Sequence, residues 1–121
     1  MLSESGPECI YLACGATDMR KSIDSLAALV THAFDLDPFA DAWFVFCNRG
    51  CDKLKLLRWD HNGFWLYYRR LERGRFDWPA ANNAAEHSSR VITRRQLAWL
   101  LDGLPLEQYK AHKAVTARIV V

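Results

Sequence analysis

Two runs of β-forming residues, "KLKLLRWD" at 53–60 and "FWLYYRRL" at 64–71, flank the dipeptide Asn62-Gly63, and this arrangement constrains the fold most. Asn-Gly is the strongest short signal for a two-residue hairpin loop, because a type I′ turn needs positive φ at both central residues. We therefore expect an antiparallel hairpin at the centre of the fold, with Asn62 and Gly63 as its loop.

This loop fixes which residues of the hairpin face each other, and side chains alternate between its two faces. One face is apolar apart from Lys55 opposite Arg70, and we expect it to pack on a helix. The other face combines side chains that stack on bases with side chains that bind phosphates, namely Arg58, Trp65, Tyr67 and Arg69. Either the two rings form an exposed aromatic platform, or the C-terminal helix covers them.

Hydrophobic spacing predicts two helices. Apolar residues recur with the helical period over 18–33, which indicates a long amphipathic helix with Thr17 as its N-cap. Thr93 and Gln96 form a capping box ahead of a short helix over 94–102.

Two further apolar stretches predict strands, "ECIYLAC" at 8–14 and "AWFVFCN" at 42–48, the second buried on both faces. The expected fold class is α+β, with a mainly antiparallel sheet of four strands, the long helix on one face and the short helix near the C-terminus. We expect a single domain over 1–121, with an ordered core at about 8–104, a loop at 79–91 and a tail at 105–121.

Composition restricts the class of protein. Hydrophobic residues make up 50% of the chain, which excludes general disorder. No apolar run approaches the ~20 residues of a membrane span. The N-terminus lacks the basic start and apolar core of a signal peptide, so we expect a cytoplasmic protein with reduced thiols and no membrane partner.

The net charge of +2 conceals an asymmetry along the chain. Residues 1–47 hold two bases and seven acids, a net charge of −5, whereas residues 48–121 hold 14 bases and seven acids, a net charge of +7. Such a split indicates a bipolar surface with one side suited to a polyanion, although most basic surfaces are merely solvated.

The four cysteines raise the question of a zinc site. Cys9 and Cys14 bracket a predicted strand, which places their side chains on opposite faces and roughly 16 Å apart, too far to bind one ion. Cys47 and Cys51 flank a turn, but no second pair at zinc spacing accompanies them. We therefore expect no metal and no other cofactor.

Motifs of catalysis are missing from the sequence as well. It contains no phosphate loop, no Gly-x-Ser-x-Gly and no His-Glu-x-x-His. We therefore assign no catalytic residue and no small-molecule substrate, and we do not expect an enzyme.

The order of several short motifs resembles a known family. Gly-x-Thr-Asp-Met-Arg, Phe-x-Asn-Arg, Leu-Lys-Leu-Leu, Gly-Phe-Trp-Leu, Arg-Leu-Glu-x-Gly-x-Phe and Trp-Pro occur in this order over roughly residues 10–104. This pattern resembles the small TnpB-like accessory protein of bacterial insertion-sequence family 66. The resemblance implies a protein encoded beside a separate transposase that assists transposition without being the transposase. It brings no catalytic residue to this chain.

The candidate nucleic-acid contacts are the bases of segment 49–75 and two bases from the start of the first helix: Arg20, Lys21, Arg49, Lys53, Lys55, Arg58, Arg69, Arg70, Arg73 and Arg75. The preferred function is a non-enzymatic accessory factor that contacts element DNA, the transposase or other proteins of the element. The alternative is a protein-interaction module that binds the transposase without touching DNA. A third hypothesis, a nuclease-like enzyme, has no motif in its support.

Overall fold

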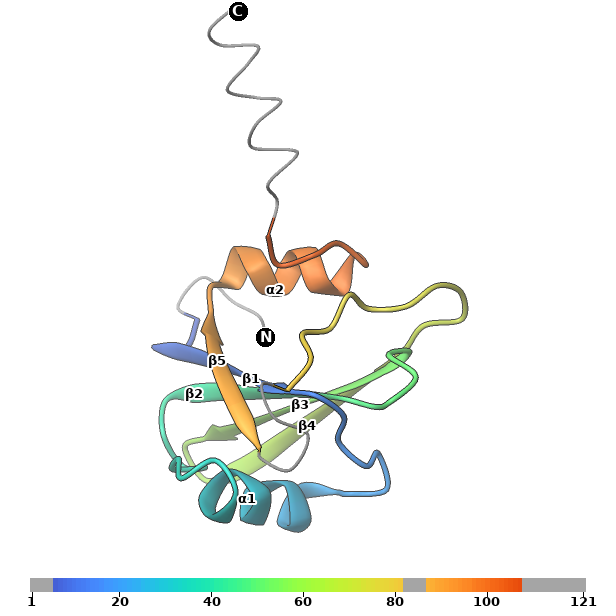
Figure 1. Ribbon diagram of the computed structural model, residues 1–121. Helices are drawn as coiled ribbons and strands as arrows, with labels where there is room; N and C mark the ends of the chain where they lie inside the picture. The colour runs from blue at the N-terminus through green and yellow to red at the C-terminus, as the bar shows by residue number, and fades with distance from the viewer. Residues whose placement is uncertain (1–5, 82–86, 108–121) are drawn as a thin grey trace, which may run out of the picture.

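A five-stranded mixed sheet forms the centre of the computed structural model, which describes residues 6–81 and 87–107 (Figure 1). The strand order is β4-β3-β2-β1-β5. The strands are β1 (Cys9–Cys14), β2 (Ala42–Cys47), β3 (Lys53–Asp60), β4 (Gly63–Arg70) and β5 (Ser88–Ile92). The helices are α1 (Ile23–His32) and α2 (Arg94–Leu101).

The sheet lies between the two helices, with α1 on one face and α2 on the other (Figure 1). Strands β1 and β2 are parallel neighbours, and α1 connects them. The other three strand pairs are antiparallel. The prediction of an α+β fold with a mainly antiparallel sheet is therefore confirmed, with one parallel pair added.

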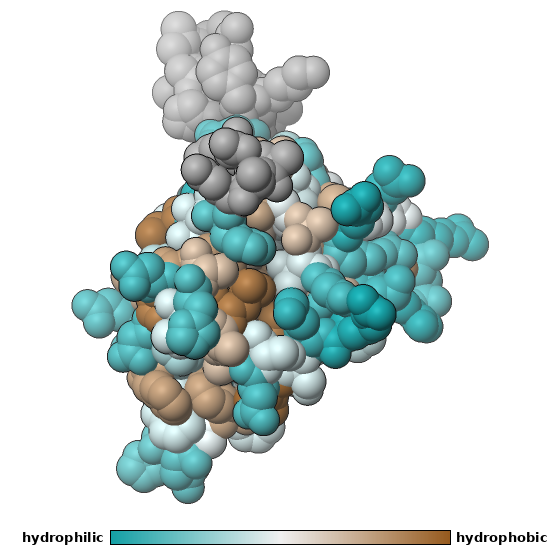
Figure 2. Space-filling view, turned by 60° about the horizontal axis from the view of Figure 1, so that its bottom comes forward, coloured by the Kyte–Doolittle hydropathy of each residue, from teal (hydrophilic) through white to brown (hydrophobic). Residues whose placement is uncertain are grey.

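The core has two halves because side chains of the central strand alternate between the two faces. Every residue of β2 is buried, as the sequence predicted. Trp43, Val45 and Cys47 pack on the α2 side, whereas Phe44 and Phe46 pack on the α1 side. Seen from the α1 side, hydrophobic surface gathers near the middle, and hydrophilic side chains project on either side of it (Figure 2).

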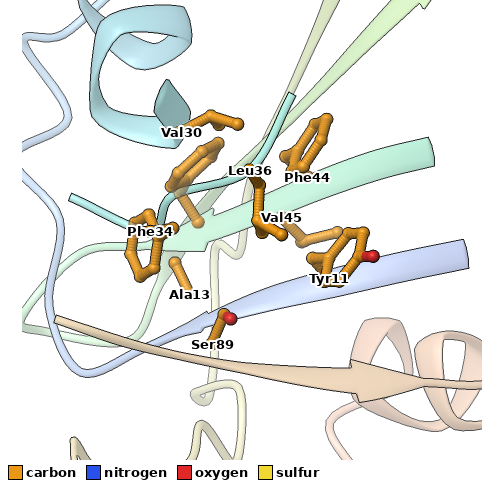
Figure 3. A pocket seen from close by; sticks show the side chains of 9 residues that line it. Tyr11, Ala13, Val30, Phe34, Leu36, Phe44, Val45 and Ser89 are labelled. Carbon is orange, nitrogen blue, oxygen red and sulfur yellow. The ribbon is translucent and has the colours of Figure 1, made fainter. Parts of the chain in front are cut away.

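A small pocket opens within the α1 half of the core (Figure 3). Its walls are mostly hydrocarbon, from residues such as Val30, Phe34 and Phe44, with polar groups on Tyr11 and Ser89. The free space in it is about 10 Å³, which is no more than one water molecule needs. This pocket is therefore a packing feature of the core.

The first helix is shorter than predicted. It begins at Ile23 with Ser22 as N-cap, and the Ser22 N–H donates to Ser25 Oγ at 2.9 Å. Thr17 is not the cap: its N–H donates to the carbonyl of Cys47 at 2.7 Å, which ties the segment before the helix to the end of β2. Sequence periodicity extended the helix because Met19 also packs on the core.

The second helix agrees with its prediction. Thr93 is the N-cap of α2, and its side chain accepts a hydrogen bond from the Gln96 N–H at 3.0 Å. The Gln96 side chain in turn accepts from the Thr93 N–H at 2.9 Å. This reciprocal pair is the capping box that the sequence predicted.

The prediction of a loop over 79–91 is wrong at its C-terminal end, where β5 forms. Ser88–Ile92 pairs antiparallel with β1 as an edge strand of the sheet. Within β5 only Ile92 is buried, and it pairs with Ile10 of β1. The sequence of β5 therefore lacks the alternation of apolar and polar residues that predicts a strand. Part of the predicted loop, residues 82–86, lies outside the described residues, as do residues 108–121 of the predicted tail. Leu106, in the described part of the tail, is buried in the α2 half of the core.

The hairpin forms, but its loop lies one residue earlier than predicted. Asp60 pairs with Gly63, so His61 and Asn62 are the loop residues, and β4 starts at Gly63. Only His61 has positive φ (61°), whereas a type I′ turn would require it at both positions. Each pairing is displaced by two residues, so Lys55 faces Tyr68 and not Arg70.

Aromatic packing explains this register. Trp59 lies opposite Phe64, with ring centroids 5.0 Å apart, and Phe39 contacts both rings. A displacement of two residues keeps every side chain on its expected face, because the strand period is two. The predicted division of the hairpin into an apolar face and a mixed basic–aromatic face therefore still holds.

We predict that His61→Gly stabilises the protein by about 0.5 kcal/mol, because glycine removes the cost of positive φ at that position. Gly63→Val should leave stability unchanged or raise it, since Gly63 begins a strand and a Cβ there would contact nothing within 4 Å. Urea denaturation of both variants measures the two effects. A loss of 1 kcal/mol or more in Gly63→Val would instead support the Asn62-Gly63 loop.

Candidate nucleic-acid interface

Three connecting segments meet at one edge of the sheet, on the right of Figure 1. Strands β1 and β2 end there, β3 begins there and β4 ends there, as their pairing requires. The segments at this edge are 15–22, 48–52 and 71–79. We call these segments, with the adjoining ends of β3 and β4, the basic edge.

Asn48 organises the turn between β2 and β3. Its Oδ1 accepts hydrogen bonds from the N–H groups of Asp52 and Lys53, both at 3.0 Å. Its Nδ2 donates to the Asp52 carboxylate at 2.7 Å. Cys51 adopts positive φ (58°), and its N–H donates to the Asn48 carbonyl at 3.1 Å. One side chain, that of Asn48, thus holds the turn rigidly. The sequence alone did not predict this role for Asn48.

The segment after β4 is bound to this turn and to the end of β1. The N–H groups of Leu71 and Phe76 donate to the carbonyls of Asp52 (2.8 Å) and Cys51 (2.7 Å). The Trp78 indole N–H then donates to the Ala13 carbonyl at 2.9 Å. These bonds place Arg73 and Arg75, which lie between the anchored positions, next to the β2–β3 turn.

Most of the predicted contact residues gather at the basic edge. Nine of the ten bases lie on its segments or on the adjoining strand ends: Arg20, Lys21, Arg49, Lys53, Lys55, Arg69, Arg70, Arg73 and Arg75. The acids on the same segments are Asp18, Asp52, Glu72 and Asp77. Nine bases against four acids leave a local charge of +5.

Ion pairs hold some of these bases and leave others available. Arg20 forms a bidentate pair with Asp18, and Arg70 pairs with Glu72 at 2.8 Å. Lys53 lies 3.6 Å from Asp52. Within residues 6–81 and 87–107, six bases of the basic edge make no ion pair: Lys21, Arg49, Lys55, Arg69, Arg73 and Arg75.

The Asp18 carboxylate is held in its ionised form by Arg20. Hydrogen bonds from the side chain and the backbone of Arg20 lower its pKa to about 2. Because the pKa is depressed in the folded protein, the pairing contributes above the ordinary pKa of an aspartate and is lost as the pH falls towards 2. At neutral pH Asp18 therefore neutralises Arg20.

Lys55 has a structural role: its side chain joins β3 to the segment before α1. Its Nζ donates to the carbonyls of Met19 (2.9 Å) and Lys21 (2.7 Å), and the Tyr68 ring lies 5.9 Å away. These contacts hold the segment before α1 against β3. Its ammonium therefore already has protein acceptors, unlike the other five bases without ion pairs.

Arg58 and Trp65 lie near the opposite end of the hairpin. Trp65 and Arg70 are five positions apart, which is about 17 Å along an extended strand. Arg58 faces Trp65 across the β3–β4 pair and lies 3.8 Å from Asp60. The structure thus divides the predicted patch into the basic edge and a separate site near the hairpin loop.

Helix α2 does not cover the outer ring of the predicted aromatic platform. Trp65 is 48% exposed and stacks on the half-buried Tyr67, with ring centroids 6.1 Å apart. Its indole N–H donates to the Asp60 carboxylate at 3.0 Å, which fixes the ring. One face of a rigid indole is thereby available on an edge strand of the sheet.

Thiol chemistry finds little support in the geometry. The buried Cys47 has its thiol pKa raised to about 12, mainly by burial, so it stays protonated at neutral pH. In the described part of the chain, no group of three or more His, Cys, Asp or Glu side chains could hold a metal ion. The absence of a bound metal remains a prediction.

Comparison with known proteins identifies the class to which this small α+β domain with its basic edge belongs. A family model described as "IS66 Orf2 like protein" matches residues 8–111. The chain therefore belongs to the IS66 Orf2-like family, whose members are accessory proteins associated with transposition. The resemblance inferred from its short motifs is confirmed.

Two relatives come from Sinorhizobium fredii (strain NBRC 101917 / NGR234), and both are described as uncharacterized proteins. The protein y4hO is 39% identical over 95 residues, which cover 78% of this chain and 79% of the relative. The protein y4jC is 36% identical over 80 residues, which cover 66% of this chain and 68% of the relative. No solved structure matches this chain.

The motifs that carry the resemblance converge in space. Four of these motifs fall on the basic edge or end there: Gly-x-Thr-Asp-Met-Arg, Phe-x-Asn-Arg, Arg-Leu-Glu-x-Gly-x-Phe and Trp-Pro.

Among the described residues, neither helix is long and apolar enough to cross a membrane.

We predict that Lys55→Met lowers the free energy of unfolding by about 1–3 kcal/mol, because two partly buried carbonyls lose a charged donor. The matched variant Lys53→Met removes only a long surface ion pair and should change stability by less than about 0.5 kcal/mol. Urea denaturation measures both stabilities. Equal losses in the two variants would contradict the claim that the hydrogen bonds of Lys55 stabilise the fold.

Proposed function

We propose that this protein is a non-enzymatic accessory factor of transposition that contacts element DNA through its basic edge. The observation that carries the proposal is the local charge of +5, with five bases besides Lys55 that make no ion pair within the described residues. Three segments distant in sequence supply these bases. Guanidinium groups suit phosphate oxygens because they donate bidentate hydrogen bonds.

The side chains of this surface lie on anchored backbone. Asn48 holds the turn that carries Arg49, and the bonds of Leu71 and Phe76 hold the segment that carries Arg73. Side chains on ordered backbone lose less freedom on binding than side chains on a loose tail. This order supports a defined phosphate-contacting surface over a merely solvated one.

The exposed ring of Trp65 supports a second contact on the same partner. Aromatic side chains stack on unpaired bases without sequence preference. A DNA strand that followed β4 from the basic edge towards the hairpin loop would cover about 17 Å before it reached this ring.

Contacts with the transposase and other proteins of the element form part of the same proposal. Binding to the transposase alone is the competing function.

We predict that the triple variant Arg49→Ala, Arg69→Ala, Arg73→Ala flattens the dependence of log affinity on log salt by about two to three units. Each lost phosphate contact removes roughly one unit. Fluorescence anisotropy on terminal element DNA at several salt concentrations measures the slope. The triple variant should remain folded, since all three side chains are exposed, and it should no longer support transposition.

The control is Arg95→Ala, which removes an exposed base of α2 and should leave the slope unchanged. If the wild-type protein bound DNA with an affinity independent of salt, the result would favour the protein-interaction module. Full support of transposition by the triple variant would favour it as well.

A further inference from the structure

An open hollow lies where the parallel strands β1 and β2 both end. It is lined by the segment after β1 and by the turn after β2, through Ala16, Thr17, Asp18, Met19, Asn48, Arg49 and Gly50. Its volume is about 400 Å³. The carboxyl ends of neighbouring parallel strands are where open α/β sheets commonly bind ligands. Most of the lining residues belong to two of the motifs that carry the family resemblance.

Hydrogen bonds within the protein hold both walls of the hollow. The Thr17 N–H donates to the Cys47 carbonyl at 2.7 Å and joins the two walls at their base. Lys55 Nζ holds the first wall through the Met19 carbonyl, and Asn48 holds the second. The hollow therefore exists before any ligand arrives, which reduces the ordering cost of binding.

The charges of the hollow suit an anion. Its one acid, Asp18, is neutralised by Arg20. Arg49 is exposed and has no ion pair within the described residues. The backbone N–H groups of Arg49 and Gly50 also make no hydrogen bond in that part of the chain. These groups together offer several donors to phosphate oxygens.

The size of the hollow exceeds what a phosphate needs. Its volume falls at the lower end of the range of about 300–1,000 Å³ that is typical of small-ligand sites. Beside the donors, Ala16 and Met19 supply apolar wall against which a sugar or a base can lie. A phosphate alone would leave this part of the hollow unused.

We propose that the hollow binds one nucleotide of a DNA strand, with its phosphate on Arg49 and its sugar and base against Ala16 and Met19. The inference rests on the proposed function and names the form of DNA that the basic edge takes. A nucleotide stacked inside a duplex cannot enter the hollow unless it leaves the stack. The protein should therefore favour DNA with a single-stranded end over blunt duplex.

Titration of ¹⁵N-labelled full-length protein with dTMP tests the site directly. Backbone amide shifts should concentrate in residues 16–19 and 48–50, and inorganic phosphate and thymidine should each bind about tenfold more weakly than dTMP. Arg49→Ala should weaken dTMP about tenfold, since it removes a charged donor. Arg95→Ala, with the same loss of charge on α2, should leave the titration unchanged.

Ala16→Trp tests the hollow without changing its charge, because Ala16 is exposed and an indole would fill the space. Wild-type protein should bind a duplex with a three-nucleotide overhang at least fivefold more tightly than the blunt duplex. Ala16→Trp should abolish this preference while it keeps the salt-dependent binding of blunt duplex.

The outcomes separate the two proposals. Salt-dependent DNA binding without dTMP shifts at the hollow would overturn the nucleotide site and leave the proposed function standing. Equal affinity for inorganic phosphate and dTMP would reduce the hollow to an anion site and overturn the inference. Site-specific dTMP shifts without any binding to DNA would support a mononucleotide site and overturn the proposed function.

Discussion

Complete burial of β2 determines how the rest of the molecule is arranged. All six of its side chains, Ala42–Cys47, lie in the core. A layer must therefore cover each face of the strand, and a neighbouring strand, β1 or β3, pairs along each of its sides. Helix α1 covers one face as it crosses from β1 to β2, and α2 covers the other. The crossover makes β1 and β2 parallel, and parallel strands end at the same edge. The basic edge follows from this geometry.

Charge in space follows the sheet more closely than it follows the chain. Asp35, Asp37 and Asp41 are exposed in the connection that leads into the start of β2, at the edge opposite the basic one. Arg20 and Lys21 come from the acidic half of the sequence and still lie on the basic edge. The resulting charge separation can orient the protein in the field of a polyanion before contact.

Local signals in the sequence were sufficient where a single element determines its own structure. The apolar run of β2 and the capping box of Thr93 and Gln96 gave a strand and a helix at the expected places. The start of α1 was not predictable, because the backbone of Thr17 bonds to Cys47, which is distant in sequence. Strand β5 escaped prediction for the same kind of reason: its pairing with β1 depends on a partner far along the chain.

The candidate site shows the same division. Sequence alone identified nearly every base of the basic edge, because base-rich segments are visible in any chain. It could not separate Arg58 from that edge or give Lys55 its acceptors, since both depend on register and on a loop thirty-odd residues away. It also gave no sign that Asn48 and Thr17 border one hollow.

The two-residue shift in the β3–β4 pairing has a consequence for how this family can vary. Because strand side chains alternate, lengthening or shortening the β3–β4 connection by an even number of residues leaves Trp65 and Arg69 on the α2 side and Leu66 on the α1 side. A change by one residue would exchange the two faces along the whole of β4, which would turn Leu66 away from the α1 half of the core and bring Trp65 to it. Relatives of this protein should therefore differ in hairpin length by even steps, or carry a β-bulge that absorbs the odd residue, and this parity is independent of any function of the loop.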